Sequence, residues 1–377
     1  MIVLSRPGTD YGIAFTRNVQ LPLEAEDLYF YPRGRDALLV ALQVLMVMPG
    51  DLVVIPAYIC DSTIEPLRQA GYRIVFIDVE RDLQLNPTTV LNTVRACGAK
   101  AVLLVHYFGF PSEVSRLVAL LRPHGVRVIE DCCHSFLTHS GSKRIGLHGD
   151  AAIFSMRKTL PIMDGGALRL NVCDFDRSAL GAPSDARPAV GRYIASRAAE
   201  AIVAAVGWPN IYSKNVDKFK KLIQGGDKSH AHAPVTYREP RRQEPSKLLA
   251  NYLSSDDYLR KVSCRTAANY AQLVEGVLAI GLQPYIPKLP YGCVPQWAPF
   301  DDPSGRIVPW LRKHGVGACH WPWYELPAEV AAAPSAYPRS NELNCRLALM
   351  PVHQSIGHYQ IAYMLRVLGQ LVNLPAS

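Results

Sequence analysis

The sequence predicts an α/β protein, in which a large domain with a mainly parallel, helix-covered sheet precedes a smaller α+β domain. Two observations support this fold class. Short apolar runs alternate with stretches whose apolar residues recur at helical spacing, the runs lying at 51–56, 73–79, 101–109 and 126–132. These runs are apolar throughout instead of at every second position, as expected for parallel strands buried on both faces.

The helices between these strands have their own start and stop signals. They are expected at 35–47, 62–72, 86–99 and 112–125. Pro49-Gly50 stops the first helix, and Gly71 closes the second. The third opens after Asn86-Pro87, because asparagine caps a helix well and proline suits its first turn. Further strands are expected at 151–155 and 167–170.

The pattern changes in the second half of the chain. It weakens after about 172, where one helix candidate is followed by polar, charged sequence, and long helices begin at 246. The later elements are a helix at 187–208, long helices at 246–278, a helix and a strand within 306–323, and a helix, strand and helix within 340–372. We therefore predict a large domain at 1–245, with an N-terminal arm and a basic loop at 214–245, and a small domain at 246–377.

Composition favours a soluble, cytoplasmic protein. Of the 377 residues, 49% are hydrophobic and 19% are charged, which is typical of globular proteins. The longest uncharged apolar runs are too short to span a bilayer, and the N-terminus lacks the pattern of a signal peptide. The nine cysteines include no CxxC pair, so reduced thiols in the cytoplasm are expected.

The charge balance of +8 is compatible with anionic ligands. The basic residues are scattered apart from one cluster at 214–232, which could be a solvated loop, a lid over a phosphorylated substrate or a nucleic-acid contact. The scatter favours no nucleic-acid partner. His230 and His232 lie in that cluster without a cysteine or aspartate pattern nearby, so no metal site is predicted.

The segment FSMRKTLPIMDGGALRL, at 154–170, points to chemistry. It places Lys158 between a buried strand and the double glycine Gly165-Gly166. A lone lysine is usually a solvated surface residue, but one at such a strand end can lose its proton and bind an aldehyde as a Schiff base. Asp131 ends another predicted strand, where a carboxylate is either a helix cap or the partner of a cation, such as the protonated ring nitrogen of pyridoxal 5′-phosphate (PLP).

These motifs follow one another in a fixed order: YPRGRDAL, PGDLVVIPAY, FIDV, VHYFG, IEDCCHS, GDAAIFS, Lys158 and DGGAL. The series resembles the DegT/StrS family of PLP-dependent sugar aminotransferases. Later segments, SKLLANYL, RTAANYAQL and LMPVHQ, resemble the small domain of that family. The resemblance implies the PLP-dependent transferase fold of the aspartate aminotransferase type. It also implies PLP as the cofactor and a homodimer with shared active sites.

Carried over position by position, the resemblance assigns four residues. Lys158 matches the lysine that holds the cofactor, and Asp131 matches the carboxylate under the pyridine nitrogen. Ser155 matches a serine that helps to hold the cofactor phosphate. Gly34 matches the glycine of the phosphate-binding turn at a helix N-terminus, where backbone N–H groups suit an anion.

Several positions depart from the family pattern. Lys158 follows Ser155 by three residues, where the family has five. His134 replaces a glutamine that contacts the ring hydroxyl, and it could do the same or be a core histidine. Arg33 and Arg35 replace small hydroxyl residues of the phosphate turn, and their guanidinium groups could bind the phosphate. Cys60 stands where relatives have an aromatic residue, so Tyr58 could cover the cofactor ring instead. The loose candidates for a residue from the partner subunit are Arg238, Arg241 and Arg242.

The resemblance therefore implies an aminotransferase that converts the ketone of a sugar nucleotide to an amine, with glutamate as the expected donor. Two alternatives stay open. One is a PLP enzyme acting on a cyclitol or another non-sugar ketone; the dehydratase variant of the family is disfavoured because it replaces the lysine with histidine. The other is a PLP-binding regulatory protein without turnover.

Overall fold

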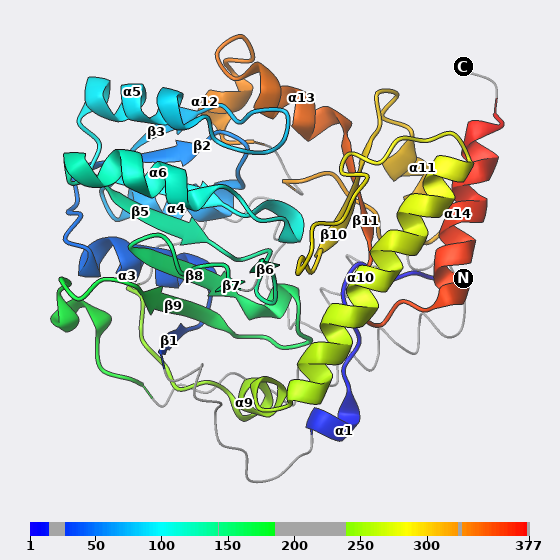
Figure 1. Ribbon diagram of the computed structural model, residues 1–377, viewed down its shortest axis with the longest axis horizontal. Helices are drawn as coiled ribbons and strands as arrows, with labels where there is room; N and C mark the ends of the chain where they lie inside the picture. The colour runs from blue at the N-terminus through cyan, green and yellow to red at the C-terminus, as the bar shows by residue number, and fades with distance from the viewer. Residues whose placement is uncertain (15–26, 142, 185–238, 323–325, 375–377) are drawn as a thin grey trace.

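The computed structural model of the 377-residue chain describes residues 1–14, 27–141, 143–184, 239–322 and 326–374 (Figure 1). The predicted helix at 187–208, the basic cluster at 214–232 and Arg238 lie outside these residues. None of the helices in the described ranges is long and apolar enough to cross a membrane.

A seven-stranded sheet forms the centre of the large domain, in the order β1-β9-β8-β5-β4-β2-β3. Its strands are β1 (Leu28–Tyr31), β2 (Leu52–Pro56), β3 (Arg73–Ile77), β4 (Ala101–Val105), β5 (Arg127–Asp131), β8 (Ala151–Ser155) and β9 (Gly166–Leu170). Strands β3, β2, β4, β5 and β8 run parallel, whereas β9 is antiparallel to both β8 and β1. This arrangement confirms the mainly parallel α/β prediction.

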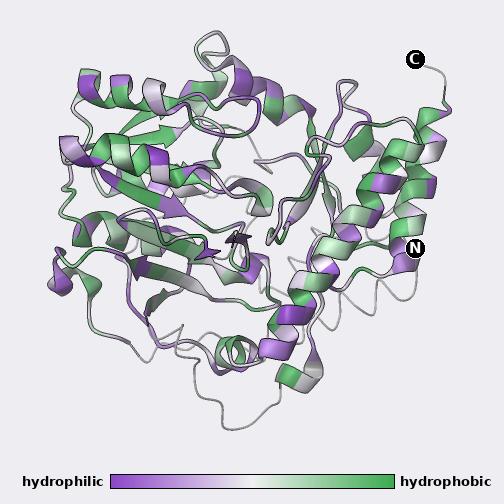
Figure 2. Cartoon of the chain, viewed as in Figure 1, coloured by the Kyte–Doolittle hydropathy of each residue, from purple (hydrophilic) through white to green (hydrophobic). Residues whose placement is uncertain are grey.

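Helices pack on the sheet because both faces are apolar. All five residues of β4 and all five of β8 are buried, as the uninterrupted apolar runs predict. Figure 2 shows green along the strands with purple towards several of their ends, and the covering helices alternate between green and purple. The helices of this domain are α3 (Gly34–Val44), α4 (Asp61–Gln69), α5 (Pro87–Cys97) and α6 (Val114–Leu121). They confirm the predicted helices to within a few residues.

One predicted strand ends early. The run at 101–109 leaves the sheet at Val105 and turns through a 3-10 segment, η1 (Tyr107–Gly109). Phe108 in this turn adopts φ 55° and ψ 16°, a left-handed conformation that is uncommon for a bulky residue. The turn is held from the second half of the chain, since the Gln296 N–H donates to the Phe108 carbonyl at 2.7 Å.

The second half forms a smaller α+β unit. Its elements are α10 (Asp256–Ala279), β10 (Trp297–Asp301), α11 (Ile307–Lys313), α12 (Ala328–Ala331), α13 (Pro338–Arg346), β11 (Leu347–Pro351) and α14 (His358–Val372). Strands β10 and β11 pair antiparallel, and α10 packs against α14. The strand predicted within 306–323 is reduced to single bridges, from Val316 to Val3 and from Cys319 to Leu349.

Two segments connect the units. The N-terminal arm, assigned to the large domain from sequence, bridges to Val316 of the smaller unit before it reaches α1 (Tyr11–Ala14). Helix α9 (Lys247–Leu253), assigned to the small domain, shares an apolar cluster with the β8–β9 hairpin. The domain boundary at 245 therefore stays a prediction.

Candidate active site

The candidate site lies at the carboxyl edge of the parallel strands. Because β2, β4, β5 and β8 are parallel, the residues that follow them meet at one edge of the sheet. Those residues are Tyr58 after β2, His106 after β4, Asp131 to His134 at the end of β5, and Ser155 to Lys158 after β8. In Figure 1 this edge faces β10, β11 and α10.

Glycines bring the N-terminus of α3 against this edge. A Cβ at Gly34 would lie 2.6 Å from the Cys133 Sγ and 3.4 Å from the Ser155 Cβ, and a Cβ at Gly166 would lie 2.2 Å from the Arg33 carbonyl carbon. Neither position has room for a side chain. No side chain caps α3, so its first N–H groups are available to an anion at the place where β5 and β8 end.

Lys158 ends a short 3-10 turn, η3 (Met156–Lys158), in the β8–β9 hairpin. Its side chain is half-buried and makes no hydrogen bond or ion pair with any residue that the structure describes. The next residue is held from the small unit, because Gln354 Nε2 donates to the Thr159 carbonyl at 3.1 Å. The position of the lysine is therefore fixed by its backbone, while its amine stays free.

The DGG motif explains the return of this hairpin. Gly165 has φ 98°, which suits glycine, and its carbonyl accepts a bond from the Met156 N–H at 2.8 Å. Asp164 accepts the Ser246 N–H at 3.0 Å and the Ser246 hydroxyl at 2.9 Å. Ser246 in turn caps α9. Asp164 thus ties the lysine hairpin to α9.

Asp131 is a buried carboxylate without a cation. Its side chain is 8% exposed, and its Oδ1 accepts the nearby Cys133 N–H at 2.9 Å. No ion pair within 4.0 Å involves Asp131 in the described part of the chain. Asp131 does not cap any described helix, so the helix-cap interpretation of this carboxylate has no support in the described structure. A cationic ligand would complete this carboxylate.

His134 lies beside Asp131 and is held as a neutral imidazole. Burial, and then the charge of Lys158, lower the pKa of His134 well below its ordinary value. Its Nδ1 accepts the Phe108 N–H at 3.3 Å, and its ring stacks on Phe108 with centroids 5.7 Å apart. Because Nδ1 is the acceptor, the proton is on Nε2, which can donate. The left-handed turn at Phe108 aims the N–H that selects this tautomer.

Tyr58 lies deeper than the other candidates. It is completely buried, and its ring packs on Trp321 and Tyr107 at centroid distances of 4.8 and 5.5 Å. Burial raises the pKa of the phenol well above its ordinary value, and the hydroxyl has no partner in the described structure. The ring belongs to an aromatic contact between the two units. A role for Tyr58 against a cofactor ring stays a prediction.

The arginines of the site come from three segments. Arg33 is the N-cap residue of α3 and is exposed, while Arg35 in the first turn is half-buried. Sequence reasoning missed Arg6 and Arg157, although the shortened turn between Ser155 and Lys158 leaves Arg157 next to the lysine. Two candidates for a residue that reaches the partner subunit's site are described: Arg242 lies 5.0 Å from the centroid of the Tyr29 ring, and Arg241 is exposed. A contribution of either residue to the partner's site stays a prediction.

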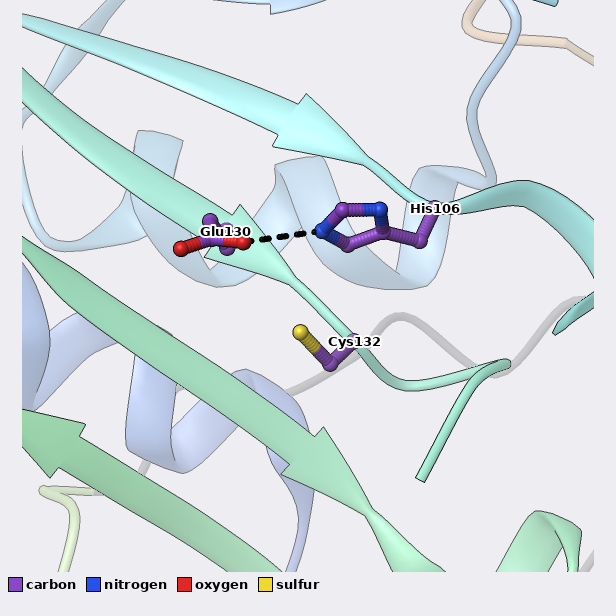
Figure 3. Close-up of side chains that lie close together, drawn as sticks. All are labelled: His106, Glu130 and Cys132. Atoms are coloured by element: carbon purple, nitrogen blue, oxygen red, sulfur yellow. Dashed lines mark hydrogen bonds and ion pairs between the residues drawn. The ribbon is translucent and has the colours of Figure 1, made fainter. Parts of the chain in front are cut away.

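A second titratable group lies on the other face of β5. His106, Glu130 and Cys132 lie close together at the ends of β4 and β5 (Figure 3). Side chains alternate along a strand, so Glu130 and Cys132 share one face and Asp131 points to the other. The His106 Nε2 donates to the Glu130 Oε2 at 3.0 Å, and the Ser112 N–H donates to the His106 Nδ1 at 2.9 Å.

This group forms a buried hydrogen-bond network. Glu130 also accepts three N–H groups of the loop before β8, those of Gly146, His148 and Gly149, at 3.0, 2.8 and 2.6 Å. Burial, and then the charges of Glu130 and Asp131, raise the pKa of Cys132 well above its ordinary value, so the thiol keeps its proton. The four hydrogen bonds to Glu130 tie the ends of β4 and β5 to the loop before β8.

The fold is shared with solved aminotransferase structures. In this chain the carboxyl edge of the mainly parallel sheet carries a lysine hairpin, a buried carboxylate and an uncapped helix N-terminus. A chain from Streptococcus pneumoniae, whose structure is described as a PLP form, superposes with a TM-score of 0.70 at 14% identity and covers 99% of this chain and 100% of that one.

Sequence comparison finds a family match over part of the chain. Residues 32–176 match the model of the DegT/DnrJ/EryC1/StrS aminotransferase family. A UDP-N-acetyl-3-dehydro-α-D-glucosamine 3-aminotransferase from Acidithiobacillus ferrooxidans is 33% identical over 32% of this chain. A dTDP-4-dehydro-2,3,6-trideoxy-D-glucose 4-aminotransferase from Saccharopolyspora spinosa is 35% identical over 39%. The matches span 33% and 38% of the length of these relatives.

The residues present fit PLP. The cofactor needs an amine for its aldehyde, a carboxylate for its ring nitrogen and an anion site for its phosphate. Lys158 offers a free amine, Asp131 is a buried carboxylate lacking a cation, and the uncapped α3 begins at Gly34 beside Ser155. The Ser155 hydroxyl has no partner among the described residues, so it is available as well.

The network around Glu130 generates a first prediction. Burial alone would raise the pKa of Glu130, but the bond from His106 and the N–H donors outweigh it, and the pKa falls below its ordinary value. A depressed carboxyl pKa stabilises the fold above the unfolded pKa, and this stability is lost as pH falls through the folded value. Glu130→Gln should lower the free energy of unfolding by about 3 kcal/mol at neutral pH, because an amide cannot accept all four donors.

Denaturant unfolding between pH 3 and pH 7 measures this effect. As the pH falls from 7 to 3, the free energy of unfolding should decrease less in the variant than in the wild type, because the variant has no carboxylate at position 130 to protonate. Glu275→Gln, at an exposed position of α10, is the matched control and should behave as wild type. A Glu130→Gln protein as stable as the control would contradict a structural role for this carboxylate.

Proposed function

We propose that this chain is a PLP-dependent aminotransferase that converts the ketone of a nucleotide-linked sugar to an amine, with glutamate as the donor. The observation that carries the proposal is the meeting of free Lys158, unpaired Asp131 and the uncapped start of α3 at one edge of the sheet. The relatives named above act on UDP- and dTDP-linked keto sugars, which supports this substrate class.

When bound, PLP supplies an aldehyde to which amines add and a ring that delocalises the electrons released when a neighbouring C–H bond breaks. Lys158 would hold the cofactor through its amine and the aldehyde carbon. Its Nζ, when not engaged in that bond, would act as the general base for the proton on the donor α-carbon and as the general acid that returns a proton. In the half-reaction with the ketone, Lys158 would carry the same protons in the opposite direction.

The other side chains hold charge in place. The carboxylate of Asp131 keeps a proton on the ring nitrogen, which lets the ring accept electrons. His134 is a neutral imidazole with its proton on Nε2. Its Nε2–H would donate a hydrogen bond to the hydroxyl oxygen of the cofactor ring. The N–H groups at the start of α3, with Arg33 or Arg35 and the Ser155 hydroxyl, bind the phosphate.

We further infer that the protein is a cytoplasmic homodimer whose partner subunit completes the site. Support for the compartment comes from the cysteines, which are all free in the described structure, as in a reducing environment. Support for the dimer comes from the family resemblance alone. Size-exclusion chromatography with light scattering tests the dimer directly.

Lys158 generates the second prediction. If its amine binds the aldehyde, borohydride reduction of the holoprotein should fix the mass of the cofactor on the peptide that contains Ser155 to Pro161. Peptide mass spectrometry locates the label. Lys158→Ala, tested in parallel, should give no labelled peptide. Label on any other lysine of the wild-type protein would refute the assignment.

The phosphate turn generates the third prediction. A bound phosphate dianion that loses one guanidinium contact is left short of donors, which costs on the order of 2–5 kcal/mol. Arg35→Ala, or Arg33→Ala if that residue makes the contact, should weaken PLP binding at least tenfold. Titration of the apoprotein with PLP, followed by absorbance, measures the affinity. If both variants bind PLP as the wild type does, neither arginine holds the phosphate.

Asp131 generates the fourth prediction. Asp131→Asn keeps the shape and the bond to the Cys133 N–H but removes the charge. The variant should fold and retain PLP on Lys158, while the half-reaction with glutamate slows about 100-fold, equivalent to roughly 2.7 kcal/mol. Single-turnover absorbance and the melting temperature are measured on the same sample. A wild-type rate with a lowered melting temperature would make Asp131 a purely structural residue.

The same half-reaction separates the alternatives. A regulatory PLP-binding protein would bind the cofactor but show no single turnover with glutamate. A cyclitol or other non-sugar acceptor would leave the glutamate half-reaction intact and appear only when a panel of ketones is offered to the aminated enzyme.

A further inference from the structure

Three arginines lie on separate segments that pack around the turn of Lys158. Arg33 ends the turn before α3, Arg157 precedes the lysine in η3, and Arg6 lies in the N-terminal arm. The proposed roles above use at most one of them, Arg33, for the cofactor phosphate. Arg6 and Arg157 have no assigned function.

Backbone contacts bring Arg33 and Arg157 together. Gly34 and Ser155 are so close that a Cβ at Gly34 would touch the Ser155 Cβ at 3.4 Å, and Gly166 packs directly on the Arg33 backbone. Arg33 and Arg157 each lie within two residues of this contact. Their placement therefore follows from the same packing that fixes the lysine hairpin.

Backbone contacts also bring Arg6 to the same place. The His353 Nε2 donates to the Leu4 carbonyl at 2.9 Å, and the Gly8 N–H donates to the Ser355 hydroxyl at 2.9 Å. Gln354, between those two anchors, donates to the Thr159 carbonyl at 3.1 Å. The arm around Arg6 and the turn around Lys158 are thus held by three consecutive residues.

The positive charge of this cluster is not balanced. No ion pair within 4.0 Å involves Arg6, Arg33 or Arg157 among the residues that the structure describes. Burial lowers the pKa of Arg157, and repulsion from Arg6 and Arg33 adds to the effect. Arg157 is nevertheless exposed to solvent by its accessible surface, so an anion could reach its guanidinium.

Asp36 only partly compensates. It feels the charges of Arg33 and Arg157, but burial raises its own pKa, so its carboxylate is itself desolvated. Three guanidinium groups with one nearby carboxylate carry a net positive charge, which an anion bound between them would offset. Guanidinium groups bind carboxylate and phosphate through paired N–H donors, which gives the cluster its ligand chemistry.

We propose that Arg6 and Arg157 form an anion subsite beside Lys158, separate from the cofactor phosphate, that binds the phosphate or carboxylate group of a substrate. This inference rests on the proposed function, because both the nucleotide sugar and the amino donor carry such groups. The subsite would place the substrate so that its reacting carbon reaches the lysine, and the N-terminal arm would be part of the active site.

Calorimetric titration of the holoprotein with non-reacting probes tests the subsite. UDP represents the diphosphate of a sugar nucleotide, and glutarate represents the carboxylates of the donor without its amine. Arg6→Gln and Arg157→Gln should each weaken binding of one probe about tenfold or more at constant ionic strength. Loss of UDP affinity assigns the subsite to the sugar nucleotide, and loss of glutarate affinity assigns it to the donor.

Arg116→Gln, at an exposed position of α6, is the matched control and should bind both probes as the wild type does. The affinity of the apoprotein for PLP should stay within about threefold of the wild type in Arg6→Gln and Arg157→Gln. Because the probes do not react, the protein can bind them at the subsite even if the half-reaction with glutamate fails. Conversely, the half-reaction can proceed in a protein whose arginine variants bind both probes normally. The two proposals can therefore fail separately.

Four results would overturn the proposal. The first is unchanged affinity for both probes in both variants. The second is a loss of PLP affinity in place of probe affinity, which would assign the arginines to the cofactor phosphate. The third is a change of oligomeric state without a change in probe binding, which would assign them to a contact between copies of the chain. The fourth is a wild-type holoprotein that binds neither probe at millimolar concentration.

Discussion

The candidate site depends on the direct contact between the start of α3 and the β8–β9 hairpin. Gly34 and Gly166 make this contact possible, because any Cβ there would overlap Cys133 or the backbone of Arg33. The contact aims the free N–H groups of the helix at the edge where β5 and β8 end. An anion bound by the helix and an aldehyde bound by Lys158 can then belong to one small molecule.

The second unit fixes the same edge from outside. Gln354 holds the lysine turn, Gln296 holds the turn at Phe108, and Asp78 at the end of β3 accepts the Arg339 and Ser340 N–H groups at the start of α13. Each contact joins a loop that follows a parallel strand to the small unit. The lysine hairpin, the turn at Phe108 that contacts His134, and the end of β3 are therefore held in their relative positions by hydrogen bonds to the small unit.

The sequence predicted the large domain well because its strands and helices are encoded locally. The apolar runs, the cap at Asn86 and the stop at Pro49-Gly50 are each read within a few residues, and the structure follows them. The early end of β4 could not be read this way, because the turn at Phe108 is held by Gln296 from the distant small unit. Lys158 and Asp131 were predicted from their motifs, whereas the segment of Arg6 reaches this edge through contacts 349 and 347 residues apart in sequence.

Neighbouring carboxylates on β5 show why the two faces of one strand differ in function. Glu130 is fully buried and accepts four hydrogen bonds, so its charge is compensated by the fold. Asp131, one residue later and also buried, accepts one backbone N–H and has no cation. Leaving a buried carboxylate uncompensated costs several kcal/mol, which a protein tolerates where a bound cation restores the balance. The network of Glu130 holds the end of the strand, whereas the carboxylate of Asp131, without a cationic partner in the described structure, is what the proposed cofactor site requires on the opposite face.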